Sequence, residues 1–138
     1  MQRIYLDTNV FISWIDKELG ANYRPLFEEA DAFFDWVKAN DACLVLSNWF
    51  FEEAERVYYS ASDAVIKTFT DAAIRIEVVI EKRRPAIGDF VRRGLHTADA
   101  IHAAIALKHK CDCIVTFNVK DFRKADDLIR SLQPNEFG

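Results

Sequence analysis

The stretch that decides the fold is IYLDTNVFISW, residues 4–14. Its first three residues, 4–6, form a short apolar run that is typical of a buried parallel strand, and Asp7 follows at the carboxyl end of that run. Thr8 or Asn9 can then begin a helix, because the apolar residues beyond them recur at helical spacing. A strand that ends in an acid and passes directly into a helix is typical of the first unit of an α/β fold.

Strands and helices continue to alternate along the chain. Two further buried strands are predicted over residues 43–46 and 113–116, and residues 76–80 are compatible with a strand or a helix. The predicted helices cover residues 25–37, 49–59, 62–73, 86–93, 97–107 and, after a polar turn at 117–121, residues 125–132. This alternation predicts a single α/β domain over residues 1–138, a three-layer α/β/α sandwich with a central, mostly parallel sheet of four to five strands.

The composition limits the classes of protein to consider. The chain has 138 residues, of which 51% are hydrophobic and 13% aromatic, so it can bury a core and is not expected to be disordered. The net charge of −4 argues against a broadly basic nucleic-acid binder but not against a nuclease that gathers acids at its centre. The odd set Cys43, Cys111 and Cys113 gives no disulfide framework, and their apolar neighbours favour buried thiols. Because the sequence shows no signal peptide and no membrane-spanning run, we expect a cytoplasmic protein that contacts no membrane.

Acidic side chains follow the predicted strands at the edge where an open α/β sheet binds its ligands. They come from four segments: Asp7 after the first strand, Glu52 and Glu53 after the second, Asp99 at the start of a helix, and Asp121, with Asn118, after the strand at 113–116. Because grouped carboxylates repel one another, we expect a cation among them. Oxygen ligands suit Mg²⁺ or Mn²⁺, and such ions can activate water for phosphodiester cleavage.

Three stretches of the chain resemble the PIN domain, and within it the VapC-type toxins of bacterial and archaeal toxin–antitoxin pairs. IYLDTNVFISW is similar to the family's first-strand motif. LVLSNWFFEEAERVYY, residues 44–59, is similar to its second strand and following helix, and HTADAIHAAIALKHKCDCIVTFNVKDF, residues 96–122, to its third acidic motif and last turn. The resemblance covers nearly the whole chain and implies a PIN-like form of the predicted sandwich.

The resemblance implies a metal-dependent endoribonuclease that hydrolyses RNA phosphodiester bonds. It implies that Asp7, Glu53 and Asp99 are catalytic and hold Mg²⁺ or Mn²⁺. The family's fourth acid falls two residues after a threonine, where this chain has Asn118, so Asn118 or the nearby Asp121 is expected to complete the set. Polar neighbours are expected to orient the carboxylates or the substrate phosphate, namely Thr8, Asn9, Ser47 and Thr116.

The same resemblance implies three kinds of partner. RNA is the expected substrate. A cognate antitoxin is expected to bind near the acidic pocket, where an antitoxin arginine could pair with the carboxylates. A second copy of the chain is expected in a homodimer.

Each candidate acid also has an ordinary structural explanation. Asp7 could simply cap the helix that follows it, and Asp121 could cap the last predicted helix. Glu52 and Glu53 are adjacent, so a helix sends them in different directions, and the family register selects Glu53. Asp99 would be favoured in the first turn of its helix by the helix dipole alone.

The remaining polar residues are weaker candidates. His102 lies one helical turn after Asp99, but its apolar neighbours favour a core or surface histidine. The densest basic region, between residues 82 and 93, could be a solvated face. Because this region precedes Asp99 closely, we expect it to contact the RNA backbone through Arg84, Arg92 and Arg93.

Four other functions are alternatives to a toxin nuclease. A haloacid-dehalogenase-like phosphatase also places an aspartate after its first strand, but it expects a second acid where this chain has Asn9. A receiver-like phospho-acceptor is disfavoured because no acidic pair precedes Asp7. A PIN nuclease of RNA processing remains an alternative, as does a degenerate PIN-like binding module, for which Asn118 is the best argument.

Overall fold

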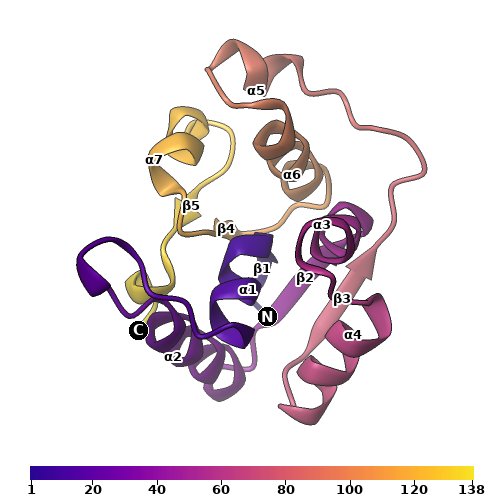
Figure 1. The fold of residues 1–138 in the computed structure, drawn as a ribbon. Coiled ribbons are helices and arrows are strands. Elements are labelled where there is room, and N and C mark those ends of the chain that lie inside the picture. The colour runs from indigo at the N-terminus through magenta and orange to yellow at the C-terminus, as the bar shows by residue number, and fades with distance from the viewer.

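A five-stranded parallel sheet forms the centre of the computed structural model, which describes residues 1–138 (Figure 1). The strands are β1 (Arg3–Leu6), β2 (Cys43–Ser47), β3 (Ile76–Val79), β4 (Cys113–Val115) and β5 (Ser131–Leu132). They are arranged in the order β3-β2-β1-β4-β5, and every neighbouring pair is parallel. The first strand of the chain is therefore the middle strand of the sheet, with β2 and β4 on its two sides.

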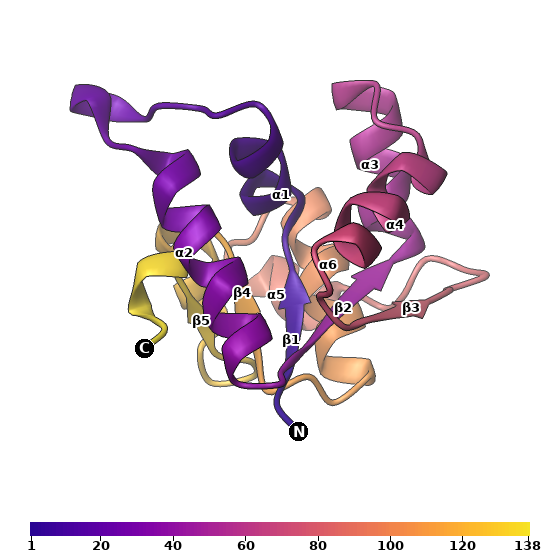
Figure 2. The ribbon, with the colours of Figure 1, turned by 90° about the horizontal axis from the view of Figure 1, so that it is seen from below.

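Helices cover both faces of this sheet. The α-helices are α1 (Thr8–Ile15), α2 (Leu26–Ala39), α3 (Asn48–Tyr58), α4 (Ser62–Asp71), α5 (Gly88–Arg92), α6 (Thr97–Lys108) and α7 (Val119–Phe122). Short 3-10 turns cover Ala21–Tyr23, Arg123–Ala125 and Pro134–Glu136. Figure 1 shows α5, α6 and α7 on one face, and Figure 2 shows α1 to α4 in front of the other. None of the helices combines the length and the apolar character needed to cross a lipid bilayer.

The alternation of side chains along β1 divides the interior into two hydrophobic clusters. Ile4 and Leu6 face the larger cluster, under α1 to α4, whereas Tyr5 faces the smaller one, under α5, α6 and α7. This is the period-two pattern of a strand that is buried on both faces. The tip of β1 therefore lies between two packed layers, which fixes the position of Asp7.

An aromatic group in the larger cluster fixes the helices that follow the central strands. Phe11 on α1 packs against Phe50 on α3 and Phe69 on α4, with ring centroids 5.8 and 5.3 Å apart. Trp14 packs against Phe34 on α2 at 4.4 Å. Aromatic contacts of this kind bury large areas in defined orientations, so α1 and α3 are held close together at the same edge of the sheet.

The structure confirms the predicted α/β class, and all five strands of the sheet are parallel. Residues 76–79, which the sequence left open between strand and helix, form β3 and pair with β2. The helix predicted over residues 125–132 is wrong. The chain instead forms α7 within the predicted polar turn, then the 3-10 turn at Arg123–Ala125, and then β5. β5 exists through its pairing with β4, where Thr116 N–H donates to the Leu132 carbonyl at 3.0 Å, and a strand of two residues has no periodicity to detect.

Candidate active site

The carboxylate of Asp7 is buried at the tip of the central strand. Its side chain is only 5% exposed, and its backbone N–H still donates to the Val115 carbonyl of β4 at 3.1 Å. Asp7 occupies the N-cap position of α1, but its carboxylate accepts no capping hydrogen bond. Helix capping therefore does not explain this acid.

Thr116 orients the Asp7 carboxylate. Its hydroxyl donates to Asp7 Oδ2 at 2.7 Å and accepts from the backbone N–H of Asn118 at 2.9 Å. Asn9 is bound in the same network, because its amide donates to the Thr116 hydroxyl at 3.3 Å and its oxygen accepts from the Phe117 N–H at 3.3 Å. Thr116 and Asn9 thus lie in one hydrogen-bond network with Asp7, while the second Asp7 oxygen, Oδ1, receives no side-chain hydrogen bond.

Glu53 and His102 lie beside Asp7. Glu53 comes from α3 and His102 from α6, and Glu53 Oε1 is 3.6 Å from His102 Nε2. One carboxylate oxygen of Asp7, one of Glu53 and one ring nitrogen of His102 all lie within 4.8 Å of one another. Of the two adjacent glutamates, Glu53 is therefore the one that the helix turns toward Asp7, whereas Glu52 is exposed.

The charges of these three side chains are strongly linked. Burial raises the pKa of Asp7, although the nearby His102 and the Thr116 hydroxyl oppose that effect. Burial would raise the pKa of Glu53, but His102, the Thr8 hydroxyl and Arg56 together outweigh this effect, and the pKa of Glu53 is lowered. For His102, burial alone would lower the pKa, yet Glu53 and the other carboxylates raise it above its ordinary value. A positive charge at this position is thus favoured by its surroundings.

Asp99 lies outside this trio but at the same edge of the sheet. Burial, followed by the charge of Asp7, raises the pKa of Asp99 to about 6. Asn118 donates from its amide to Asp99 Oδ2 at 3.3 Å, which places it between Asp99 and the Asp7–Thr116 pair. Asp121, on α7, is also outside the trio, and it lies 3.5 Å from Lys124 Nζ.

The two other hydroxyl residues have different surroundings. Thr8 is 1% exposed, and its hydroxyl lies close enough to Glu53 to help lower that pKa, but it forms no hydrogen bond. Ser47 touches none of the acids. It caps α3 by accepting from the Phe50 N–H at 3.2 Å, and its hydroxyl is 2.7 Å from that of Tyr5.

A cavity of about 280 Å³ opens between α3 and α6 at the side of these residues. Its walls carry both carboxylates and apolar groups, from Trp49, Glu52, Glu53, Arg56, Thr97, Ala98, Ile101 and His102. Two of the three clustered side chains, Glu53 and His102, therefore face a space that a ligand can enter.

Two of the three arginines that the sequence predicted as RNA contacts pair with carboxylates of the protein itself. Arg93 pairs with Asp127 at 2.7 Å, and Arg92 pairs with Asp89. Arg84, in contrast, is exposed in the segment after β3 and pairs with no carboxylate. Two of the three predicted RNA contacts are thus already partly neutralised within the protein.

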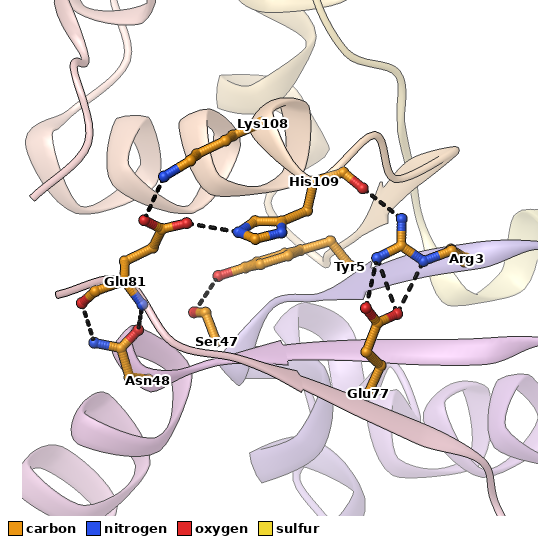
Figure 3. Close-up of polar contacts among 8 residues, drawn as sticks. All are labelled: Arg3, Tyr5, Ser47, Asn48, Glu77, Glu81, Lys108 and His109. Carbon is orange, nitrogen blue, oxygen red and sulfur yellow. Dashed lines mark hydrogen bonds and ion pairs between the residues drawn. The ribbon is translucent and has the colours of Figure 1, made fainter. Parts of the chain in front are cut away.

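A polar cluster fixes the basic segment that follows β3 (Figure 3). Glu81 accepts from Lys108 Nζ at 2.7 Å and lies 2.6 Å from His109 Nε2, while its backbone N–H donates to the Asn48 side chain at 2.8 Å. These contacts link the segment to α3 and to the end of α6. Arg84 consequently projects from a chain segment that is fixed at its start.

The donor set fits a divalent cation. Asp7 and Glu53 offer oxygens at mutual distances that one ion can bridge, Asp99 is close enough to feel the charge of Asp7, and the Thr8 hydroxyl is buried without a partner. Carboxylates and hydroxyls are hard ligands, which suits ions such as Mg²⁺ and Mn²⁺. A cation here would offset the charge of Asp7, which adds to the burial that raises the pKa of Asp99.

His102 was not among the residues predicted for the site. Its helical spacing from Asp99 was visible, but its apolar neighbours indicated a core or surface residue. The structure shows that both descriptions hold at once, because His102 is 3% exposed and still contacts Glu53. The signal that could have identified it is a polar residue one turn from a candidate acid on the same helix face.

Comparisons with known proteins identify the family of the chain and match its fold. A family model described as the PIN domain matches residues 4–128. The chain is similar in structure to VapBC-1 from nontypeable Haemophilus influenzae, with a TM-score of 0.65 and 18% identity over 96% of this chain and 98% of that one. It is also similar to VapBC2 from Rickettsia felis bound to a DNA fragment from their promoter, with a TM-score of 0.62 and 14% identity over the same shares. Among curated protein sequences, none matches the chain.

The raised pKa of Asp99 predicts how the metal-free protein responds to pH. The carboxyl has an ordinary value of 3.8 and a value of about 6 in the folded protein, so the folded state binds this proton more tightly. Its contribution to stability is full below pH 4 and is lost as the pH rises toward and through 6. Asp99→Asn should therefore raise the free energy of unfolding at pH 8 by about 1–2 kcal/mol, a value reduced for partial exposure, and by little at pH 4.

Urea unfolding in EDTA at the two pH values measures this difference. Asp121→Asn is the matched control, because the Asn118 hydrogen bond lowers the pKa of Asp121, so neutralising it should bring no gain at pH 8. A destabilised Asp99→Asn at pH 8 would show that its charge is not repelled in the folded protein.

Proposed function

Because this chain belongs to the PIN domain family, a family of nucleases, we propose that it is a metal-dependent endoribonuclease and the toxin of a toxin–antitoxin pair. The observation that carries the proposal is the buried Asp7 carboxylate at the carboxyl edge of the sheet. One of its oxygens lies within 4.8 Å of a Glu53 oxygen, close enough for both to bind one ion. Similarity to two VapBC structures over 96% of the chain supports the narrower assignment. The proposed place of action is the cytoplasm.

Asp7, Glu53 and Asp99 would hold one or two Mg²⁺ or Mn²⁺ ions, with Asp121 or Asn118 completing the set. When bound, such an ion neutralises the carboxylates, lowers the pKa of water and stabilises charge on the phosphodiester. Thr116 would keep one oxygen of Asp7 occupied and leave the other free for this purpose. Asn9 would hold Thr116 in place, and Thr8 would lie against Glu53.

The proposed reaction is hydrolysis, in which the oxygen of water adds to phosphorus and one ester oxygen leaves. The chain need not supply a nucleophile, because water takes that part. Its carboxylates instead fix where the reaction can occur, and the cavity between α3 and α6 would admit the substrate beside Glu53. Proximity of this kind accounts for a large part of the rate of such enzymes.

An antitoxin and a second copy of the chain are the proposed protein partners. The same cavity combines the carboxylates Glu52 and Glu53 with the apolar side chains Trp49 and Ile101. A partner segment with an arginine and apolar neighbours would complement that surface and would compete with RNA for it. Such competition would switch the nuclease off without any change in its fold.

Replacing Asp7 with asparagine tests the proposed chemistry. Asp7→Asn retains an oxygen for the Thr116 hydroxyl but removes a charged ligand, so Mn²⁺-dependent RNA cleavage should fall by more than about 100-fold. The assay compares structured and unstructured RNA with Mn²⁺ and with EDTA, and Asp63→Asn on the exposed side of α4 is the matched control. Equal cleavage by wild type and Asp7→Asn would contradict the proposal.

The arginines that we propose as RNA contacts differ in their expected effects. Each phosphate contact with a single strand contributes about 0.7 to the slope of log affinity against log salt concentration. Arg84→Ala should lower that slope by about this amount, whereas the joint change of Arg92 and Arg93 to alanine should lower it by less than two contacts, because both are paired with carboxylates.

Fluorescence anisotropy with labelled RNA, in the Asp7→Asn background, measures these slopes. Arg75→Ala is the control, because Arg75 pairs with Asp41 at the opposite end of β3. An unchanged slope in all the variants would remove these arginines from the RNA interface.

A further inference from the structure

His102 is placed as a ligand would be. It projects from α6 and is 3% exposed, and its Nε2 atom lies 3.6 Å from Glu53 Oε1. A ring nitrogen of His102 lies within 4.8 Å of oxygens from both Asp7 and Glu53, although Asp99, on the same helix, is outside this group. Two carboxylates and one imidazole from three separate elements thus surround one point.

The other ring nitrogen of His102 is held by a buried chain of hydroxyls. Nδ1 lies 2.5 Å from the hydroxyl of Tyr5, which lies 2.7 Å from the hydroxyl of Ser47 (Figure 3 shows the Tyr5–Ser47 contact). Tyr5 is fully buried on the central strand, and Ser47 is fixed because it accepts from the Phe50 N–H. Histidines that bind metals almost always have such a partner on their second nitrogen, because it sets the tautomer and the plane of the ring.

The hydroxyl chain can serve both forms of the ring, since each hydroxyl can donate or accept. With a proton on Nε2 facing Glu53, Ser47 donates to Tyr5, and Tyr5 donates to Nδ1. With a cation on Nε2 instead, the ring carries its proton on Nδ1 and donates it to Tyr5, which donates to Ser47.

The Thr8 hydroxyl is a further group at this point that an ion could satisfy. It is buried beside Glu53, whose pKa it helps to lower, but it makes no hydrogen bond of good geometry. Buried hydroxyls are normally satisfied, and an unsatisfied one costs free energy. An ion with its bound waters at this point would give the Thr8 hydroxyl a partner while neutralising Asp7 and Glu53.

We propose that His102 is a nitrogen ligand of the metal at this site and that the site therefore selects Mn²⁺ over Mg²⁺. This inference rests on the proposed metal site, but not on nuclease activity. Sites made only of oxygen suit Mg²⁺, whereas imidazole favours transition ions, and Mg²⁺ also gives up its waters reluctantly. Tyr5 acts as a positioning residue, because it holds the imidazole through Nδ1.

Pulsed electron paramagnetic resonance of Mn²⁺ bound to the whole protein, with no RNA, tests the inference directly. We expect modulation from a directly coordinated nitrogen nucleus in wild type, its loss in His102→Gln, and its retention in His109→Gln. His109 is the matched control because it also contacts a buried carboxylate, that of Glu81. Titration should show that His102→Gln reduces the ratio of Mn²⁺ to Mg²⁺ affinity by about tenfold or more.

The outcomes distinguish this inference from the proposed function. Mn²⁺ bound by wild type without nitrogen modulation overturns the His102 ligand and leaves the carboxylate site standing. No binding of Mn²⁺ by wild type overturns both. Nitrogen modulation that disappears in His109→Gln but not in His102→Gln also overturns the inference, because the ion would then lie at Glu81.

Tyr5→Phe provides a second variant in case His102→Gln does not fold. It retains the imidazole and the aromatic ring but removes the hydroxyl that holds Nδ1. Mn²⁺ affinity should fall by about tenfold while nitrogen modulation persists in the ion that still binds. An unchanged Mn²⁺ affinity would overturn the positioning role of Tyr5.

Discussion

The structure depends on one electrostatic constraint, which is that several carboxylates share the carboxyl edge of a buried sheet. Asp7 is almost fully enclosed there, with a single hydroxyl donating to it, and Glu53 lies beside it. His102, whose pKa is raised, compensates part of this negative charge. Burial and the charge of Asp7 raise the pKa of Asp99 to about 6. Buried carboxylates that lower the stability of the fold are typical of a binding site rather than of a structural core.

The order of the strands makes this concentration of charge possible. Because β1 lies between β2 and β4 and all three are parallel, the segments that follow these strands begin side by side. They bring Asp7, the start of α3 with Glu53, and Thr116 to one place, and α6 adds Asp99 and His102 across the smaller hydrophobic cluster. The aromatic packing of Phe11 against α3 and α4 then keeps the carboxylates from moving apart.

The sequence predicted those parts of the fold and site that local patterns encode. Apolar runs identified β1, β2 and β4. The acids that follow predicted a site around Asp7, Asp99 and the pair Glu52 and Glu53, from which the family resemblance selected Glu53. The sequence did not predict β5, which depends on pairing with β4, or the pairing of Arg93 with Asp127, which joins residues 34 positions apart. The role of His102 also depends on tertiary structure, because only the folded protein shows that its buried face meets Glu53 on one side and Tyr5 on the other.

The proposed chemistry requires a divalent cation between Asp7 and Glu53. Crystals grown with Mn²⁺ and measured at the manganese absorption edge test it most directly, because anomalous scattering identifies the element and its position together. We expect an anomalous peak in contact with the side chains of Asp7 and Glu53. A map without a peak at this edge of the sheet, or with manganese only beside Glu81, would contradict the proposal.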